Sequence, residues 1–274
     1  MSTRTGSSRA RTAIGVVIVV VLLFPLYWMV NASLQPSGAL LKPAPDLFPL
    51  HGTLDGYRTA LTTQLGHLGS SLIVSLGTVV VSLAIAMPAS YALAQLRVRG
   101  GPLILFVLLI VQMIPGIVMA NALYTVFSNL GLVDSYFGLV LADSTATIPF
   151  AILLLRAFMI SIPRDLSEAA RVDGAGHWRT FVSIIVPVSR NAMVTAGLFS
   201  FLFAWADFLF AITLTTGQGF APVTVGIYRF LGNQSADWNG IMATATLASV
   251  PAAILLVIAQ RYVVAGLTSG AVKD

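Results

Sequence analysis

The sequence predicts an all-α fold: a polytopic membrane helix bundle with six transmembrane helices. Hydrophobic residues make up 57% of the 274 positions, charged residues make up 9%, and the mean hydropathy is +0.90. Roughly a quarter of a soluble domain is charged. A spanning helix needs about 20 mostly apolar residues. Six segments meet this requirement: Ala13–Val30, Leu72–Leu96, Leu103–Phe127, Tyr136–Leu155, Ala192–Leu214 and Ile241–Val264. Their apolar runs are continuous rather than alternating, which excludes a membrane β-barrel.

One transmembrane domain, residues 13–264, is expected between two tails, residues 1–12 and residues 265–274. The longest inner connection, residues 158–191, joins the fourth and fifth segments. Long connections are where binding surfaces concentrate. This connection is therefore the first place to look for a functional surface.

The first segment has two readings. Arg9 and Arg11 precede an apolar run, as in a secretory signal peptide. However, Tyr27 and Trp28 follow that run without a small-residue cleavage pattern. A retained membrane anchor is the reading we favour.

Basic residues are distributed unequally over the predicted connections. Three of the fifteen, Lys42, Arg58 and Arg229, fall on one side of the membrane and the others on the opposite side. Because lysine and arginine accumulate in cytoplasmic loops, both termini and residues 158–191 are expected in the cytoplasm. The sequence pI near 9.9 follows from this membrane topology, so no nucleic-acid partner is expected.

Catalytic and metal-binding chemistry is not expected. The chain has no cysteine, and His51, His67 and His177 fall in separate connections, which does not give a metal-ligand set. A phosphate-binding loop needs a lysine after glycine, within Gly-x4-Gly-Lys-Ser/Thr, and neither Lys42 nor Lys273 stands in that pattern. We therefore expect no catalytic residue, no cofactor and no ATP site in this chain.

The charged segment, Ser161–Ser189, interrupts the apolar second half of the chain and contains its only glutamate, Glu168. Asp165 and Glu168 have the capping-box spacing, which predicts that a short helix begins at Asp165. Gly174 can adopt the left-handed conformation that ends helices. The first helix is therefore expected to stop at Asp173 and Gly174.

A second short helix is predicted after this turn. Apolar residues recur there at helical spacing: Trp178, Phe181, Val182 and Ile185. Pro187 is expected to end the helix, giving a helix-turn-helix outside the bilayer with Ala169 and Ala170 as a closely approachable surface. The alternative is that Glu168 only caps a connecting helix and Trp178 rests at the lipid interface.

Polar residues inside the predicted spans mark a second candidate site, because a charged group in the membrane is costly and faces the bundle interior. The candidate solute path consists of Gln112, Asp143, Trp205, Asp207 and Phe208. A carboxylate beside aromatic rings offers a bound molecule both hydrogen bonds and ring faces. Alternatively, Asp207 pairs within the bundle or lies near an interface. Four prolines are expected to kink the spans: Pro88, Pro115, Pro149 and Pro251.

Several stretches resemble a known family. EAARVDGA at Glu168–Ala175, followed by Ile185, Val186 and Pro187, resembles the EAA loop of inner-membrane permease subunits of bacterial ATP-binding-cassette (ABC) importers. Further stretches resemble the carbohydrate-uptake, maltose permease G-like branch: SLQPS at Ser33–Ser37, SYALAQLRVRG at Ser90–Gly100, MIPG at Met113–Gly116, LGLVDSYFGLVLA at Leu130–Ala142 and AGLTSGAVKD at Ala265–Asp274.

The resemblance implies half of a carbohydrate translocation pore in the bacterial plasma membrane. The implied partners are a second permease subunit in a heterodimer, an ATPase dimer that binds ATP and Mg, an extracytoplasmic substrate-binding protein and the lipid bilayer. The implied ATPase contacts are Glu168, Ala169, Ala170, Asp173, Gly174, Ala175, Trp178 and Phe181. The tail residues Thr268, Ser269, Gly270 and Lys273 are implied to reach the ATPase, and Tyr228, Phe230 and Trp238 are implied to contact the binding protein.

The sequence departs from the family pattern at a few positions. Ala206 replaces the usual asparagine before Asp207, and the other departures are Gln35, Ser70, Gln95 and Asn191. Two other classes stay open at this point. An ion-coupled secondary carrier would use Asp143 and Asp207 as a relay, and a membrane scaffold would show no transport defect on deletion.

Overall fold

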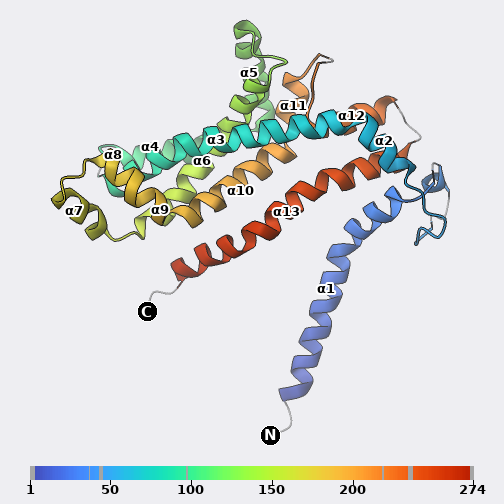
Figure 1. The fold of residues 1–274 in the computed structure, drawn as a ribbon, viewed down its shortest axis with the longest axis horizontal. Helices are drawn as coiled ribbons and strands as arrows, with labels where there is room; N and C mark the ends of the chain where they lie inside the picture. Colours follow the sequence, from blue (N-terminus) through green and yellow to red (C-terminus); the bar gives the residue numbers. More distant parts are fainter. Residues whose placement is uncertain are drawn as a thin grey trace. The chain divides into compact units, whose positions relative to one another are not determined.

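A computed structural model describes the chain at residues 4–36, 38–42, 46–96, 98–217, 219–233 and 237–271. For residues 4–10, 232–233 and 261–271 it describes the backbone alone. Every regular element in the described residues is a helix, which confirms the all-α prediction (Figure 1). The chain forms two compact units: residues 1–65 with 227–250, and residues 66–226 with 251–274.

The first unit is built on α1, Arg4–Ser33. The side chains of its apolar stretch are exposed along the whole stretch, as expected for a helix that faces lipid. Its last turn is buried instead, and Ser33 Oγ lies 2.8 Å from the Tyr57 hydroxyl of α2, Asp55–Thr63. Gly56 packs on Asn239, because a Cβ at Gly56 would lie 2.7 Å from the Asn239 carbonyl oxygen.

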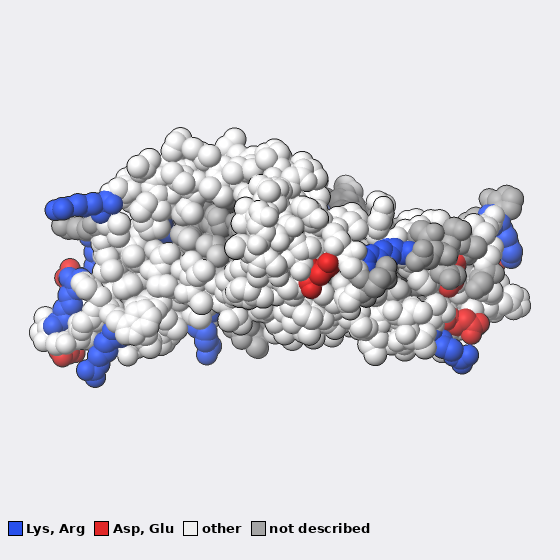
Figure 2. All heavy atoms as spheres, turned by 90° about the horizontal axis from the view of Figure 1, so that it is seen from above, with Lys and Arg blue, Asp and Glu red and all other residues white. Residues whose placement is uncertain are grey.

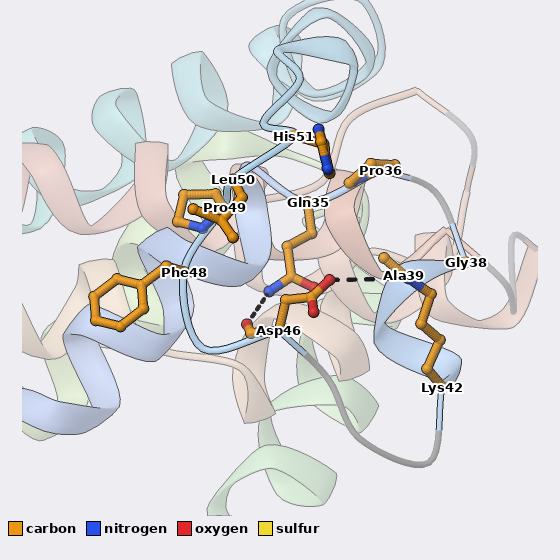
Figure 3. Close-up of a pocket in the computed structure, with 10 residues that line it drawn as sticks. All are labelled: Gln35, Pro36, Gly38, Ala39, Lys42, Asp46, Phe48, Pro49, Leu50 and His51. Carbon is orange, nitrogen blue, oxygen red and sulfur yellow. Dashed lines mark hydrogen bonds and ion pairs between the residues drawn. The ribbon is translucent and has the colours of Figure 1, made fainter.

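The connection between α1 and α2 is fastened to the end of α1 (Figure 3). Asn31 Nδ2 and Gln35 Nε2 both donate to the Asp46 carbonyl oxygen, at 3.0 and 2.7 Å. A pocket of about 360 Å³ lies beside these bonds, with the short 3-10 helix η1, Ala39–Leu41, on its wall. The Lys42 ammonium lies 3.9 Å from the Asp46 carboxylate on the same side.

The second unit centres on two long helices, α3, Leu65–Gln95, and α6, Tyr136–Ile160. Small polar residues join them: Ser82 Oγ lies 2.6 Å from Thr147 Oγ1, and Ser90 Oγ donates to the Ile152 carbonyl oxygen at 3.0 Å. Small residues let membrane helices approach closely, and their hydroxyls supply interhelical hydrogen bonds. A third helix, α10, Arg190–Ala206, packs along α6 (Figure 1).

Two of the predicted spans are interrupted, which corrects the sequence reading. The segment Leu103–Phe127 consists of α4, Gly101–Gln112, and α5, Gly116–Leu130, with a bend of 96° between them. The segment Ala192–Leu214 consists of α10 and α11, Leu209–Leu214, with Asp207 and Phe208 between them. Pro115 explains the first break, because proline disfavours helical conformation in the residue before it.

Four helices in the described residues are long and apolar enough to cross a membrane, or up to six if each of two bent pairs forms one span. The count of six, the cytoplasmic termini and the division into a domain with two tails therefore stay predictions. Several helices extend past the predicted spans: α1 begins at Arg4, α3 at Leu65, and α13, Trp238–Ala271, runs past Val264. Two connections that are predicted to lie outside also contain helices, α2 and α12, Val223–Asn233.

Substitution of Gly138 tests the packing at the start of α6. A Cβ there would lie 2.0 Å from the Leu132 carbonyl oxygen, which also accepts the Ser135 hydroxyl. We expect Gly138→Ala to lower the free energy of unfolding by about 1–3 kcal/mol, because the backbone must move. Thermal unfolding of the purified protein in detergent measures the change.

The matched control is Gly66→Ala in α3, where a Cβ would meet nothing within 4 Å. Alanine favours a helix over glycine by about 0.5–1 kcal/mol, so this variant should be neutral or slightly more stable. Equal melting temperatures for the two variants would contradict the packing described for Gly138.

Candidate functional site

The charged segment forms a pair of short helices in the second unit. The first helix, α7, Arg164–Val172, begins after Pro163, and no side chain caps it. The predicted capping box is therefore wrong: Asp165 lies in the first turn, where a carboxylate still interacts favourably with the helix dipole. Glu168 is exposed and makes no hydrogen bond or ion pair in the described part of the chain. Its carboxylate is available to a partner.

Gly174 ends α7 as the sequence predicts. Its φ is 78°, and its N–H donates to the Arg171 carbonyl oxygen at 3.0 Å. The Ala175 N–H donates to the Ala170 carbonyl oxygen at 2.9 Å, which completes a Schellman motif. This pair of hydrogen bonds fixes the direction in which the chain leaves α7.

The second part of the segment is helical from His177 to Val188. It consists of α8, His177–Thr180, a π-helical turn η2, Phe181–Ile185, and α9, Val186–Val188. Pro187 does not end it, because the chain bends by 79° only at the junction with α10. Turns of π-helix are rare and occur often at functional sites.

The apolar stripe of this second part is divided between buried and exposed members. Phe181 and Ile185 are buried in a core with Tyr91 of α3 and Leu155 of α6, and the Phe181 ring lies 5.5 Å from the Tyr91 ring. Trp178 is 70% exposed, although its ring lies 5.4 Å from that of Phe181. Phe181 is therefore a buried anchor, whereas Trp178 of the same stripe stays on the surface.

Sequence reasoning missed the part that Gln95 plays in holding the segment. Gln95 Nε2 donates to the carbonyl oxygens of Met159 and Ile162, at 2.8 and 3.2 Å, where α6 ends and the charged segment begins. A glutamine at a helix end carries no signal for such a clamp. Val172 was also missed as a surface residue: it is 88% exposed, directly before the turn.

The exposed surface of α7 and α8 combines charged, small and apolar side chains. Its members are Glu168, Ala169, Val172, Asp173 and Trp178. Figure 2 shows basic and acidic side chains gathered at one end of the second unit, next to a broad uncharged surface. Large exposed apolar side chains among polar ones mark surfaces that bind proteins.

The break between α10 and α11 is held by Asp207. Its carboxylate accepts the backbone N–H groups of Phe210 and Ala211, at 3.3 and 2.8 Å, and so caps α11. Its carbonyl oxygen accepts the Thr224 hydroxyl at 2.7 Å. Asp207 therefore satisfies backbone donors within an apolar sequence.

The two breaks lie together, since a Cβ at Gly116, where α5 begins, would lie 3.0 Å from Leu209 Cδ2 of α11. A hollow of about 210 Å³ opens beside the first break, and its wall includes Gln112, Thr145 and Phe203. Another, of about 560 Å³, opens beside the second break, and its wall includes Phe203, Asp207 and Phe208. Phe203, which sequence reasoning missed, lines both hollows.

Two residues of the predicted solute path do not line either hollow. Trp205 is buried and stacks on Phe201 with ring centroids 5.3 Å apart. Asp143 is buried in α6, and within the described residues its Oδ2 has no hydrogen-bond partner. Of the predicted path, Gln112 lines the first hollow and Asp207 and Phe208 line the second, whereas Trp205 and Asp143 line neither.

The remaining predicted contact residues are spread over other elements. Tyr228 and Phe230 lie on α12 and Trp238 begins α13, so these aromatic residues are helical rather than part of a loop. Thr268, Ser269 and Gly270 lie in the last turns of α13, without described side chains, and Lys273 lies outside the described residues. Within the described part of the chain, no three His, Asp or Glu side chains are grouped to hold a metal ion.

Comparison with known proteins identifies the family. Residues 83–269 match the family model described as a binding-protein-dependent transport system inner membrane component. The chain belongs to this family. It is 35% identical to the trehalose transport system permease protein SugB of Mycobacterium tuberculosis, over 92% of each chain. It is 32% identical to the diacetylchitobiose uptake system permease protein DasC of Streptomyces coelicolor, over 94% of each chain.

A solved structure shows the same fold. The chain aligns with TM-score 0.81 and 20% identity to a chain of a bacterial ABC transporter involved in the import of the acidic polysaccharide alginate, covering 96% of this chain and 99% of that one. Membership of the family makes the protein a membrane-embedded transport subunit of the inner membrane rather than an enzyme. It also implies a separate ATPase and a substrate-binding protein as partners.

Replacement of Asp207 tests its capping role. Asp207→Ala removes the acceptor of the Phe210 and Ala211 N–H groups, so we expect it to lower the free energy of unfolding by about 1–2 kcal/mol. Asp207→Asn keeps an acceptor oxygen and should lower the free energy of unfolding by less. Thermal unfolding in detergent ranks the three proteins, and an alanine variant as stable as the asparagine variant would contradict the cap.

Proposed function

We propose that the chain forms half of the translocation pore of an ABC importer for a carbohydrate and couples that pore to its ATPase through the charged segment. The observation that carries this proposal is the combination of an exposed surface on α7 and α8 with a buried anchor at Phe181 and Ile185. A partner that binds the exposed surface can thereby act on the bundle. Family membership supports an ATPase as that partner.

The topology proposed for this role has six spans, with both termini and the charged segment in the cytoplasm. The bent pair α4 and α5 then counts as one span, and α10 counts as another without the helical part of the charged segment that precedes it. The distribution of basic residues gives the orientation. A second permease subunit completes the pore as a heterodimer. The ATPase dimer binds ATP and Mg²⁺ and this chain binds neither, while the substrate-binding protein delivers the solute outside.

The names of relatives support a carbohydrate as the solute, because two of them are permeases for trehalose and diacetylchitobiose. The hollows beside the helix breaks provide the chemistry that a sugar needs. Phe203 and Phe208 are exposed rings, and Gln112 offers a polar amide in the hollow that it shares with Phe203. Non-helical backbone at membrane depth is tolerated where it lines a water-filled cavity, which supports a solute path at the paired breaks.

A carboxylate relay is less well supported. Both Asp207 carboxylate oxygens accept backbone N–H groups, so this carboxylate acts as a cap. The exposed surface of α7 and α8 would have no use in a carrier without an ATPase.

Substitutions in the charged segment test the coupling. The full complex, with its co-permease and ATPase, is reconstituted in proteoliposomes, and ATP hydrolysis stimulated by solute-loaded binding protein is measured. We expect Glu168→Ala to lower the stimulated rate about tenfold, the loss expected when a charge-assisted interface hydrogen bond is removed. Gly174→Ala should also lower it, because alanine is strained at a φ of 78°.

Gly176→Ala is the matched control. Gly176 has a φ of −69°, and a Cβ there would meet nothing within 4 Å. This variant should keep the wild-type rate. Full stimulation in both Glu168→Ala and Gly174→Ala would reject the coupling role, and solute uptake driven by a proton gradient without ATP would reject the importer.

A further inference from the structure

The connection after α1 carries large apolar side chains that nothing in the first unit covers. The interfacial loop, defined here as residues 46–54, exposes Leu47, Phe48, Leu50 and Leu54. Leu50 is 85% exposed and Phe48 is 64% exposed. Exposed apolar side chains this close together in a connection mark a surface that meets another apolar phase.

The interfacial loop has a defined conformation. The Tyr27 hydroxyl donates to the Leu47 carbonyl oxygen, and Asn31 and Gln35 donate to that of Asp46. At the other end, the Thr53 N–H donates to the Leu34 carbonyl oxygen at 2.7 Å. Because both ends are held against the end of α1, the exposure of the leucines is a feature of the folded loop.

The apolar surface of the loop continues that of α1. The Phe48 ring lies edge-on to the Tyr27 ring at 6.2 Å, and the Tyr27 ring lies 6.4 Å from that of Phe24. Figure 3 shows that Phe48 and Lys42 lie on opposite sides of the pocket. Phe24 and Tyr27 are themselves exposed on the spanning helix. The surface that α1 presents to lipid therefore extends onto the loop without interruption.

The distance between Tyr27 and the end of α1 matches the depth of a membrane interface. Tyr27 precedes the last residue of α1, Ser33, by six positions, so it lies about 9 Å from the helix end. Interfacial segments bury their apolar faces about 5–10 Å into the boundary between headgroups and acyl chains. Tyrosine and tryptophan gather at the same level of membrane proteins, and Trp28 adjoins Tyr27.

The charges around the loop agree with this depth. No Asp, Glu, Lys or Arg occurs between Asp46 and Asp55, and Lys42 of the exposed Lys42–Asp46 ion pair lies across the pocket from Phe48 (Figure 3). We propose that the interfacial loop lies in the membrane interface, with Leu47, Phe48 and Leu50 inserted among the lipid acyl chains. It thereby fixes the depth and tilt of α1 at this side of the bilayer.

The test uses the absence of cysteine from the chain. Leu50→Cys is labelled with the environment-sensitive fluorophore NBD, in the full complex in phosphatidylcholine nanodiscs. We expect a blue-shifted emission that is quenched by phosphatidylcholine with a spin label near the top of its acyl chain and is resistant to aqueous iodide. Thr62→Cys, at an exposed position on α2, is the matched control and should show the opposite preference, with severalfold stronger quenching by iodide.

Three other results of this experiment would contradict the proposal. Equal iodide quenching at the two positions would place Leu50 in water. Protection of Leu50 only after addition of the loaded binding protein would make the loop a protein docking surface. Protection from both quenchers in the complex would mean that a partner subunit covers it.

Discussion

Hydrogen bonding of the backbone in lipid is the constraint on which this structure depends. No water competes for peptide groups in the hydrocarbon core, so each N–H and C=O needs a partner within the protein. The long helices meet this need along their length. Where α11 begins inside an apolar sequence, the Asp207 carboxylate accepts the N–H groups of Phe210 and Ala211. The break between α10 and α11 is thus a position where a polar side chain is required.

The class of fold could be predicted because a membrane span is recognised from the hydropathy of about 20 residues, and a few polar residues do not change that sum. The breaks did not follow, because they depend on a few residues within continuous apolar runs. Of the four prolines expected to kink spans, Pro115 lies at an interruption, and Pro88, Pro149 and Pro251 lie inside continuous helices. Proline in a span is tolerated where neighbouring groups satisfy the freed carbonyl, and sequence alone does not show those neighbours.

In the charged segment, too, features set by the local sequence could be predicted, and contacts with other helices could not. Gly174 was identified correctly, because a left-handed residue is a local requirement that glycine meets best. The prediction of a helix with an apolar stripe was also correct. However, periodicity shows which residues share a helix face and does not show what packs against that face. Phe181 reaches the core under α3 while Trp178, on the same stripe, stays exposed. The cap at Asp165 failed because Pro163 starts the helix two residues earlier.

Helix α6 connects the two candidate sites physically. Near its end, Leu155 and Met159 pack with Phe181 and Ile185 of the charged segment. Further along the same helix, Thr145 lines the hollow beside the first break, and the 14 residues from Thr145 to Met159 correspond to about 21 Å of helix. Packed cores change between discrete arrangements rather than deform continuously. A displacement of the charged segment should therefore move α6 as one body and reach the wall of the hollow, without any chain of side-chain rearrangements between them.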